Sequence, residues 1–115
     1  MKSARAFFHI MVLLAVAVLL FASALAQDKT QVKVKGSEVV TGVVIVDLVK
    51  DGRAFELQCN QGAAACAVLK SGTYILLELP KNYGMYDCRN AEIYPGDKDN
   101  FQPSDRIGAY CLIQK

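Results

Sequence analysis

The sequence predicts an all-β domain: a small antiparallel barrel of about five or six strands, OB-like or SH3-like, stapled by disulfides and preceded by a signal-peptide helix. Two observations carry this prediction. After its N-terminal segment the chain is rich in Val, Ile, Leu, Tyr and Thr, with turn residues roughly every 8 to 15 positions. In addition, no long segment shows the apolar period of about 3.6 residues that is typical of a helix. A small β-sandwich is the alternative.

The N-terminal segment has the order of a secretory signal peptide. Lys2 and Arg5 supply its positive charge, and residues 6–21 are almost wholly apolar. This apolar run is shorter than the roughly 20 residues that span a bilayer, so a cleaved signal is favoured over an uncleaved membrane anchor.

Small side chains mark the expected cleavage site. Ala24 and Ala26 are of the size that signal peptidase accepts, so we expect cleavage after Ala26 and Gln27 as the mature N-terminal residue. Cleavage after Ala24 is the alternative. The chain then divides into a signal peptide, residues 1–26, and a single all-β domain, residues 27–115.

Removing the signal changes the charge and chemistry of the chain. The sequence has 13 Lys and Arg against 11 Asp and Glu, and loss of Lys2 and Arg5 leaves a neutral domain. We therefore expect no nucleic acid as partner and no membrane contact after cleavage. His9, the only histidine of the chain, also leaves with the signal. Histidine-based catalysis and histidine zinc sites are thus excluded in the mature domain, and we expect no metal or cofactor.

Four cysteines remain, Cys59, Cys66, Cys88 and Cys111. An even number in an exported chain indicates disulfides, since such chains fold in an oxidising compartment. Three pairings are possible, and we favour Cys59–Cys66 with Cys88–Cys111. On chain entropy these would stabilise the fold by roughly 2.5 and 3.5 kcal/mol. A four-thiolate metal site is disfavoured because the cysteines lack C-x-x-C spacing.

The strongest local signal is Asp51-Gly52, which favours a two-residue type I′ hairpin turn. Taking it as the turn sets the register of the two strands. Val44, Val46 and Leu48 then share one apolar face with the residues opposite them. The turn and the apolar pattern therefore agree.

The other strands are predicted from alternation and from turn residues. Residues 31–35 are expected to form an edge strand, because their lysines discourage pairing. We expect Gly36-Ser37 to turn the chain into a long strand over 39–49, with a bend or bulge at Gly42. The last three strands are expected over residues 73–79, 85–94 and 107–113, the second of them with a bulge at Arg89-Asn90.

Four aromatic residues are the candidate ligand-binding residues: Tyr83, Tyr86, Tyr94 and Phe101. Flat amphipathic rings beside Asn, Lys and Arg bind sugars, peptides or other proteins. The alternative is that the rings fill the barrel or cap its ends.

Carboxylates are the remaining candidates for chemistry. Asp47 and Glu56 face each other across the predicted hairpin, and Glu78 joins them if its strand turns that side outward. Such a group could serve acid–base catalysis, or it could lie on a solvated outer face near Lys50 or Arg53.

These features favour a non-enzymatic binding or structural module of the periplasm, envelope or extracellular space. Its expected partner is a protein, a peptide or a saccharide. The alternative is a small carboxylate-dependent, glycosidase-like hydrolase, which needs two acids about 5 to 9.5 Å apart in a cleft.

Overall fold

The computed structural model describes residues 28–97 and 100–115, which form an antiparallel β-barrel. The predicted signal peptide and its cleavage site at Ala26 and Gln27 lie outside the described residues. Within the described ranges the elements are β1 (Asp28–Val40), β2 (Val43–Lys50), β3 (Arg53–Asn60), β4 (Gly72–Glu78), β5 (Asn90–Pro95), the short 3-10 helix η1 (Pro103–Asp105) and β6 (Gly108–Gln114).

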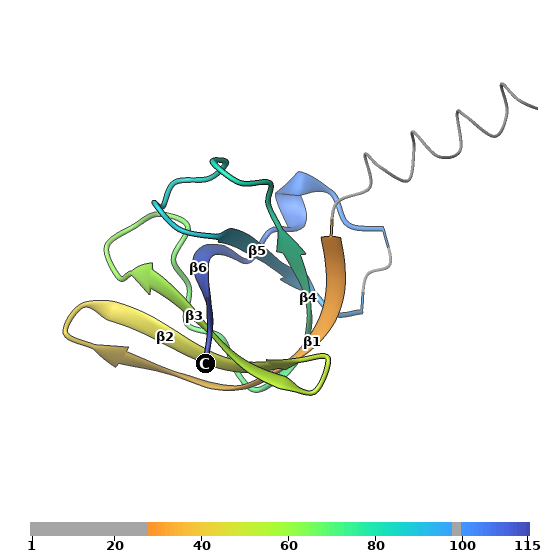
Figure 1. Ribbon diagram of the computed structural model, residues 1–115, viewed down its shortest axis with the longest axis horizontal. Coiled ribbons are helices and arrows are strands. Elements are labelled where there is room, and N and C mark those ends of the chain that lie inside the picture. Colours follow the sequence, from red (N-terminus) through yellow and green to blue (C-terminus); the bar gives the residue numbers. More distant parts are fainter. Residues whose placement is uncertain (1–27, 98–99) are drawn as a thin grey trace, which may run out of the picture.

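The strands close on themselves in the order β1-β2-β3-β6-β5-β4, so that β4 pairs with β1 (Figure 1). Each half of the barrel is a three-stranded meander, β1-β2-β3 and β4-β5-β6. The β1–β4 and β3–β6 pairings join the two halves. The prediction of an all-β antiparallel barrel of five or six strands is confirmed, and the barrel has six. Closure leaves no free edge around the ring, which removes the pairing hazard of an open sheet.

The hairpin at Asp51-Gly52 forms as predicted. Both residues have positive φ, 50° and 76°, as a type I′ turn requires. The predicted register is also confirmed, since Val44 pairs with Cys59 and Leu48 with Phe55. This hairpin sends the apolar side chains of β2 and β3 into the barrel.

The expectations for β1 were wrong in two respects. Residues 31–35 are not an edge strand, because β1 pairs with β2 on one side and with β4 on the other. Gly36-Ser37 is not a turn either; the β1–β2 register shifts between Val34 and Gly36, and the strand continues. The predicted strand over 39–49 is wrong as well, because Thr41-Gly42 is a turn, with φ of 48° and 77°, between the end of β1 and the start of β2. Thr is an unexpected residue there, because a β-branched side chain disfavours positive φ.

The fifth strand is shorter than predicted. β5 begins at Asn90, and residues 79–89 form the loop between β4 and β5. The predicted bulge at Arg89-Asn90 is therefore wrong, because Arg89 ends this loop and Asn90 begins the strand.

The core consists of side chains that alternate along the strands and point into the barrel. Leu69, from the loop 61–71, is 3 % exposed and packs against this core from one end. Ser37 fixes that loop, because its hydroxyl donates to the Leu69 carbonyl at 2.7 Å. The Tyr110 hydroxyl likewise donates to the Ala67 carbonyl at 2.7 Å. The largest fully buried side chains are Tyr110, Leu48, Leu57, Leu76, Ile93, Val34, Val44 and Val46.

Both predicted disulfides are present, and the described residues include no free cysteine. Cys59–Cys66 ties β3 to the loop 61–71, and Cys88–Cys111 ties the loop 79–89 to β6. Each bond thus anchors a long loop to the barrel. Two disulfides in so small a domain are consistent with folding in an oxidising compartment.

The strained Thr41 provides a test of the first hairpin. Thr41→Asn should raise the free energy of unfolding by about 1 kcal/mol, because Asn tolerates positive φ in an Asn-Gly turn. Asp51→Asn is the matched control, since Asp already tolerates this conformation, and it should change stability by less than about 0.5 kcal/mol. Urea unfolding of the oxidised protein measures both. Destabilisation by Thr41→Asn would contradict the assigned turn.

The buried Tyr110 predicts an alkaline loss of stability. Burial raises the pKa of Tyr110 from 10.0 to about 12. Between these values the unfolded state loses the proton first, so stability is complete below about pH 10 and falls as pH approaches 12. Tyr110→Phe should cost about 1 kcal/mol at pH 7, through the lost hydrogen bond to Ala67. The difference in unfolding free energy between Tyr110→Phe and the parent protein should become smaller between pH 10 and 12. Tyr83→Phe, on an exposed ring, should follow the parent protein throughout.

Candidate ligand-binding site on the β4–β5 loop

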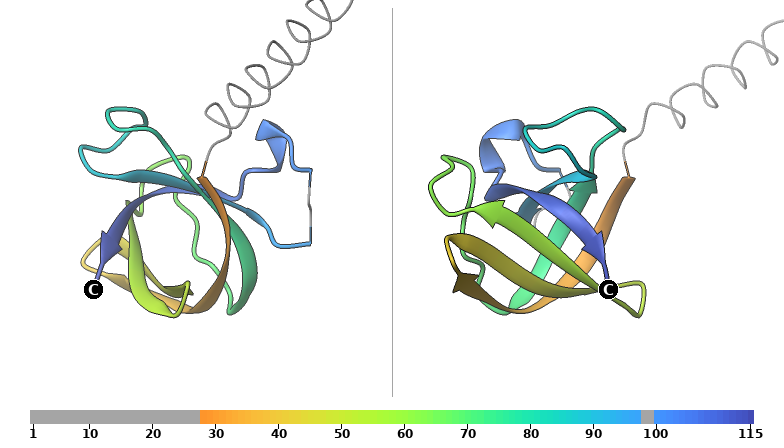
Figure 2. Two further views of the ribbon diagram at one scale, coloured as in Figure 1. Left: turned by 45° about the vertical axis from the view of Figure 1, so that its right-hand side comes forward. Right: turned by 60° about the vertical axis from the view of Figure 1, so that its left-hand side comes forward.

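The loop 79–89 projects from the barrel where β4 ends and β5 begins, and the left view of Figure 2 separates it from the segment that carries η1. Pro80 ends β4 because it has no N–H for the ladder, and its carbonyl accepts a hydrogen bond from the Tyr83 N–H at 3.1 Å. Asn82 and Gly84 follow with φ of 71° and 113°. These positive φ values turn the chain back toward the barrel.

Asn90 holds the inner part of this loop. Its side chain, in a residue that is 4 % exposed, donates to the carbonyls of Tyr86 and Cys88 at 2.7 and 3.0 Å. The Asn90 side-chain oxygen, Oδ1, accepts a hydrogen bond from the Tyr86 N–H at 3.0 Å. A Cβ on Gly84 would lie 2.2 Å from the Asn90 side chain, so only glycine leaves room for this contact. Sequence reasoning missed this role, although an Asn within a predicted strand was a usable signal, because Asn is depleted there.

The base of the loop is fixed to its neighbours by the backbone as well. The Leu79 N–H donates to the Asn90 carbonyl at 3.0 Å, and the Leu112 N–H donates to the Arg89 carbonyl at 2.8 Å. Together with the Cys88–Cys111 disulfide, these bonds hold both ends of the loop on β5 and β6.

The four candidate aromatic residues do not share one surface. Tyr83 lies on the loop and is 65 % exposed, as is its neighbour Met85 at 57 %. Tyr86, on the same loop, packs against the barrel core, and its hydroxyl is buried without a hydrogen-bond partner among the described residues. Only Tyr83 of the four therefore presents its ring fully to a partner.

Tyr94 and Phe101 belong to a different part of the molecule. Their rings stack with centroids 3.9 Å apart, and Tyr94 is only 4 % exposed. The Tyr94 hydroxyl donates to Glu92 at 2.8 Å. Burial, and next the bond to Glu92, raise the pKa of Tyr94 to about 12. Lys29 covers the Phe101 ring, with Nζ 4.7 Å from its centroid. These contacts support packing of the segment after β5 on the barrel.

A pocket of about 610 Å³ lies along the loop 79–89. Its wall combines two cations, one carboxylate, an amide and the edge of the Cys88–Cys111 disulfide. The lining residues are Lys81, Asn82, Tyr86, Asp87, Cys88 and Arg89. A second pocket, of about 330 Å³, lies beside Tyr94 and Phe101.

The candidate carboxylates fall into two separate places. Asp47 and Glu56 pair across β2 and β3 as predicted, and Lys115 Nζ lies 2.6 Å from Asp47 and 3.8 Å from Glu56. The hydrogen bond to Asp47 raises the pKa of Lys115. Lys115 thus supplies the opposite charge on this outer face.

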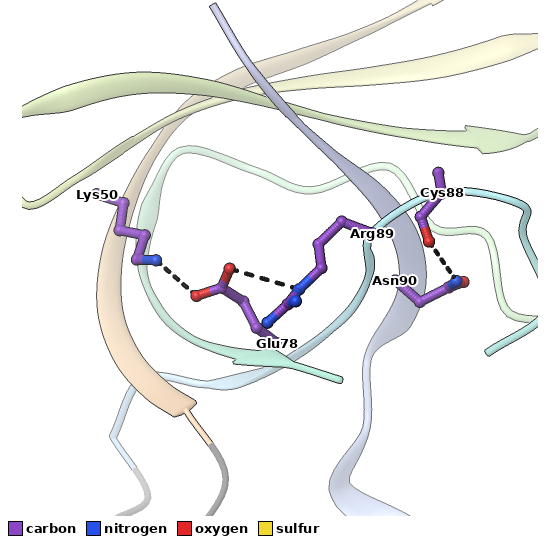
Figure 3. A network of polar contacts seen from close by, with 5 residues as sticks. All are labelled: Lys50, Glu78, Cys88, Arg89 and Asn90. Atoms are coloured by element: carbon purple, nitrogen blue, oxygen red, sulfur yellow. Dashed lines mark hydrogen bonds and ion pairs between the residues drawn. The ribbon is translucent and has the colours of Figure 1, made fainter. Parts of the chain in front are cut away.

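Glu78 lies at the end of β4, at a position that alternation directs into the mouth of the barrel. Figure 3 shows its carboxylate between Lys50 and Arg89. Lys50 Nζ lies 2.6 Å from one oxygen, and Arg89 Nε lies 3.9 Å from the other. Glu78 is therefore part of an ion-pair network separate from Asp47 and Glu56.

Among the described residues, no group of three or more His, Cys, Asp or Glu side chains could hold a metal ion. Nor does this part of the chain contain a helix long and apolar enough to cross a membrane.

Comparison with known proteins finds no relative. No protein-family model, curated protein or solved structure matches this chain.

The loop geometry predicts a specific cost for losing the Asn90 side chain. Asn90→Ala should lower the free energy of unfolding by about 2 to 3 kcal/mol, because backbone groups of Tyr86 and Cys88 lose their partners. It should also speed amide hydrogen exchange in residues 80–88. Asn60→Ala, at an exposed Asn that ends β3, is the control and should stay within about 0.5 kcal/mol of the parent. Unchanged exchange in Asn90→Ala would show that the side chain does not hold the loop.

Proposed function

We propose that this protein is an exported, disulfide-stapled, non-enzymatic module that binds a protein or peptide partner through its β4–β5 loop. The observation that carries the proposal is the exposure of Tyr83 and Met85 on a loop held at both ends and bordered by a pocket of about 610 Å³.

The composition of this surface favours a protein or peptide. Aromatic residues, Met and Arg are enriched at protein interfaces, and Tyr83, Met85 and Arg89 occur together on one loop. Tyr in particular supplies a large contact area with few rotatable bonds. A saccharide is the other partner that the sequence suggests, and it is separated from a peptide by the test below.

The anchoring of the loop also supports a binding role. Binding costs free energy when a mobile segment has to become ordered. Here the Asn90 hydrogen bonds and the Cys88–Cys111 disulfide already hold the inner part of the loop. The conformation that displays Tyr83 is thus largely formed before a partner arrives.

Two features support the proposed export. The sequence predicts a signal peptide cleaved after Ala26, and the two disulfides suit an oxidising compartment. We place the mature domain in the periplasm, the envelope or the extracellular space.

The hydrolase alternative receives less support. It needs two carboxylates about 5 to 9.5 Å apart in a cleft. Asp47 and Glu56 lie on the outer face beside Lys115, whereas Glu78 lies at the barrel mouth bonded to Lys50. The two pockets described above have one acidic lining residue each, Asp87 and Glu92.

The test is selection of ligands by the oxidised protein. A random linear peptide library and an array of oligosaccharides are screened in parallel, and dissociation constants are measured for the best ligands. We expect peptides to be selected and Tyr83→Ala to weaken them about tenfold or more, because an exposed Tyr anchor contributes at least about 1.4 kcal/mol.

Val39→Ala and Val40→Ala are the matched controls, because these valines are exposed on the β1–β2 hairpin at 44 % and 46 %. Neither should change affinity. The proposal would be overturned if only oligosaccharides were selected, or if Tyr83→Ala left the affinity for the selected ligands unchanged.

A further inference from the structure

At the mouth of the barrel, the Glu78 carboxylate has one close cationic partner and one distant one. Glu78 and Lys50 form a close pair, 2.6 Å apart, with side chains 14 % and 17 % exposed. Arg89 is 44 % exposed and touches the same carboxylate only through Nε, at 3.9 Å. Glu78 is therefore bound mainly by Lys50, and Arg89 is a loose third member (Figure 3).

Arg89 consequently keeps most of its donors available. A guanidinium carries five N–H groups in a planar fork. Within residues 28–97 and 100–115, no hydrogen bond or ion pair engages its two terminal nitrogens. The side chain lines the pocket along the loop 79–89, so these donors border a space that a ligand can enter.

A second cation borders the same pocket. Lys81 is exposed and lines this pocket, and it has no ion-pair partner among the described residues. Asp87 is the one carboxylate in the lining, so the wall carries two positive groups against one negative group. The Asn82 amide adds a neutral donor that has no hydrogen-bond partner in the described part of the chain.

We propose that this pocket binds a carboxylate of an acidic peptide segment, with Arg89 as the bidentate donor and Lys81 as the second cation. This inference rests on the proposed function, because it names the chemistry of the peptide that the β4–β5 loop binds. Arg and carboxylate match in geometry, since two parallel N–H donors meet two oxygens. Glu78 is held by Lys50 and approaches the guanidinium only through Nε, at 3.9 Å, so it leaves the two terminal nitrogens unoccupied.

The neighbouring residues define the rest of the ligand. Tyr83 and Met85 are exposed on the same loop, so an apolar side chain of the peptide has a surface to contact. The expected ligand is thus a short segment that carries Asp or Glu next to an apolar residue. A neutral segment would leave the Arg89 donors to water.

The first arm of the test uses a small probe and no peptide partner. Glutarate is titrated into the oxidised, isotope-labelled protein, and the Arg89 Nε–H and the backbone amides of residues 81–89 are followed by NMR. Sodium chloride at equal ionic strength is the control. We expect saturable shifts confined to the pocket with glutarate, and their loss in Arg89→Gln.

The second arm uses acidic peptides chosen from the linear peptide library, each paired with a version in which Gln replaces Glu and Asn replaces Asp. Arg89→Gln should weaken the acidic version about tenfold and leave the amide version unchanged. Arg89→Lys should give an intermediate affinity, because it keeps the charge and loses the fork. Lys70→Gln, at an exposed lysine at the start of the turn into β4, should have no effect.

The outcomes separate this inference from the proposed function. Selected peptides that require Tyr83 but contain no enriched acidic residue, with no glutarate shifts, would overturn the carboxylate site and leave the binding module standing. Glutarate shifts that depend on Arg89, without any selected peptide, would support the anion site and overturn the peptide partner. Acidic peptides indifferent to both Arg89→Gln and Arg89→Lys would also overturn the site.

Discussion

The pairing of β1 with β4 is the constraint on which the rest of this structure depends. It joins the first strand to the fourth across residues 28–34 and 72–78, and with the β3–β6 pairing it turns two meanders into one ring. Each ring position then has an inward and an outward face, so alternate side chains are buried together. Without this closure Val46 of β2 and Leu76 of β4 would have no common interior, and Glu78 would not meet Lys50 at the barrel mouth.

The two long loops, 61–71 and 79–89, are not part of the closed barrel and need other contacts to hold them. Both loops are held by the same combination of contacts. One loop is bound by Cys59–Cys66, by Ser37 and by the Tyr110 hydroxyl. The other is bound by Cys88–Cys111 and by the Asn90 amide. In both, a disulfide and a buried polar side chain replace the ladder hydrogen bonds that irregular backbone lacks. Held in this way, the second loop can display the exposed Tyr83 ring, Met85 and two cations without itself being a regular element.

The candidate site illustrates the limit of reasoning from residue types. Tyr83, Tyr86, Tyr94 and Phe101 are close in sequence and alike in chemistry, yet one is exposed, one packs against the core and two stack on each other elsewhere. Their exposure depends on where β5 begins, because Tyr83 and Tyr86 precede that point and lie on a loop, whereas Tyr94 lies in the strand. Asn90, which carries no chemistry of its own, marks that point and organises the loop. Its role follows from three backbone contacts that exist only in the folded chain.

The sequence alone determined the β class and the Asp51-Gly52 hairpin with its register. It left three cysteine pairings open, and the favoured one is present in the structure. The turn and the register depend on local information, because a two-residue turn needs positive φ and alternation needs only neighbours. The tertiary structure decided that β1 has partners on both sides, that Thr41-Gly42 is a turn, and that Lys50 is the close partner of Glu78. Each of these depends on strands or side chains brought together by closure of the barrel. Periodicity within a segment carries no information about which distant segment will lie beside it.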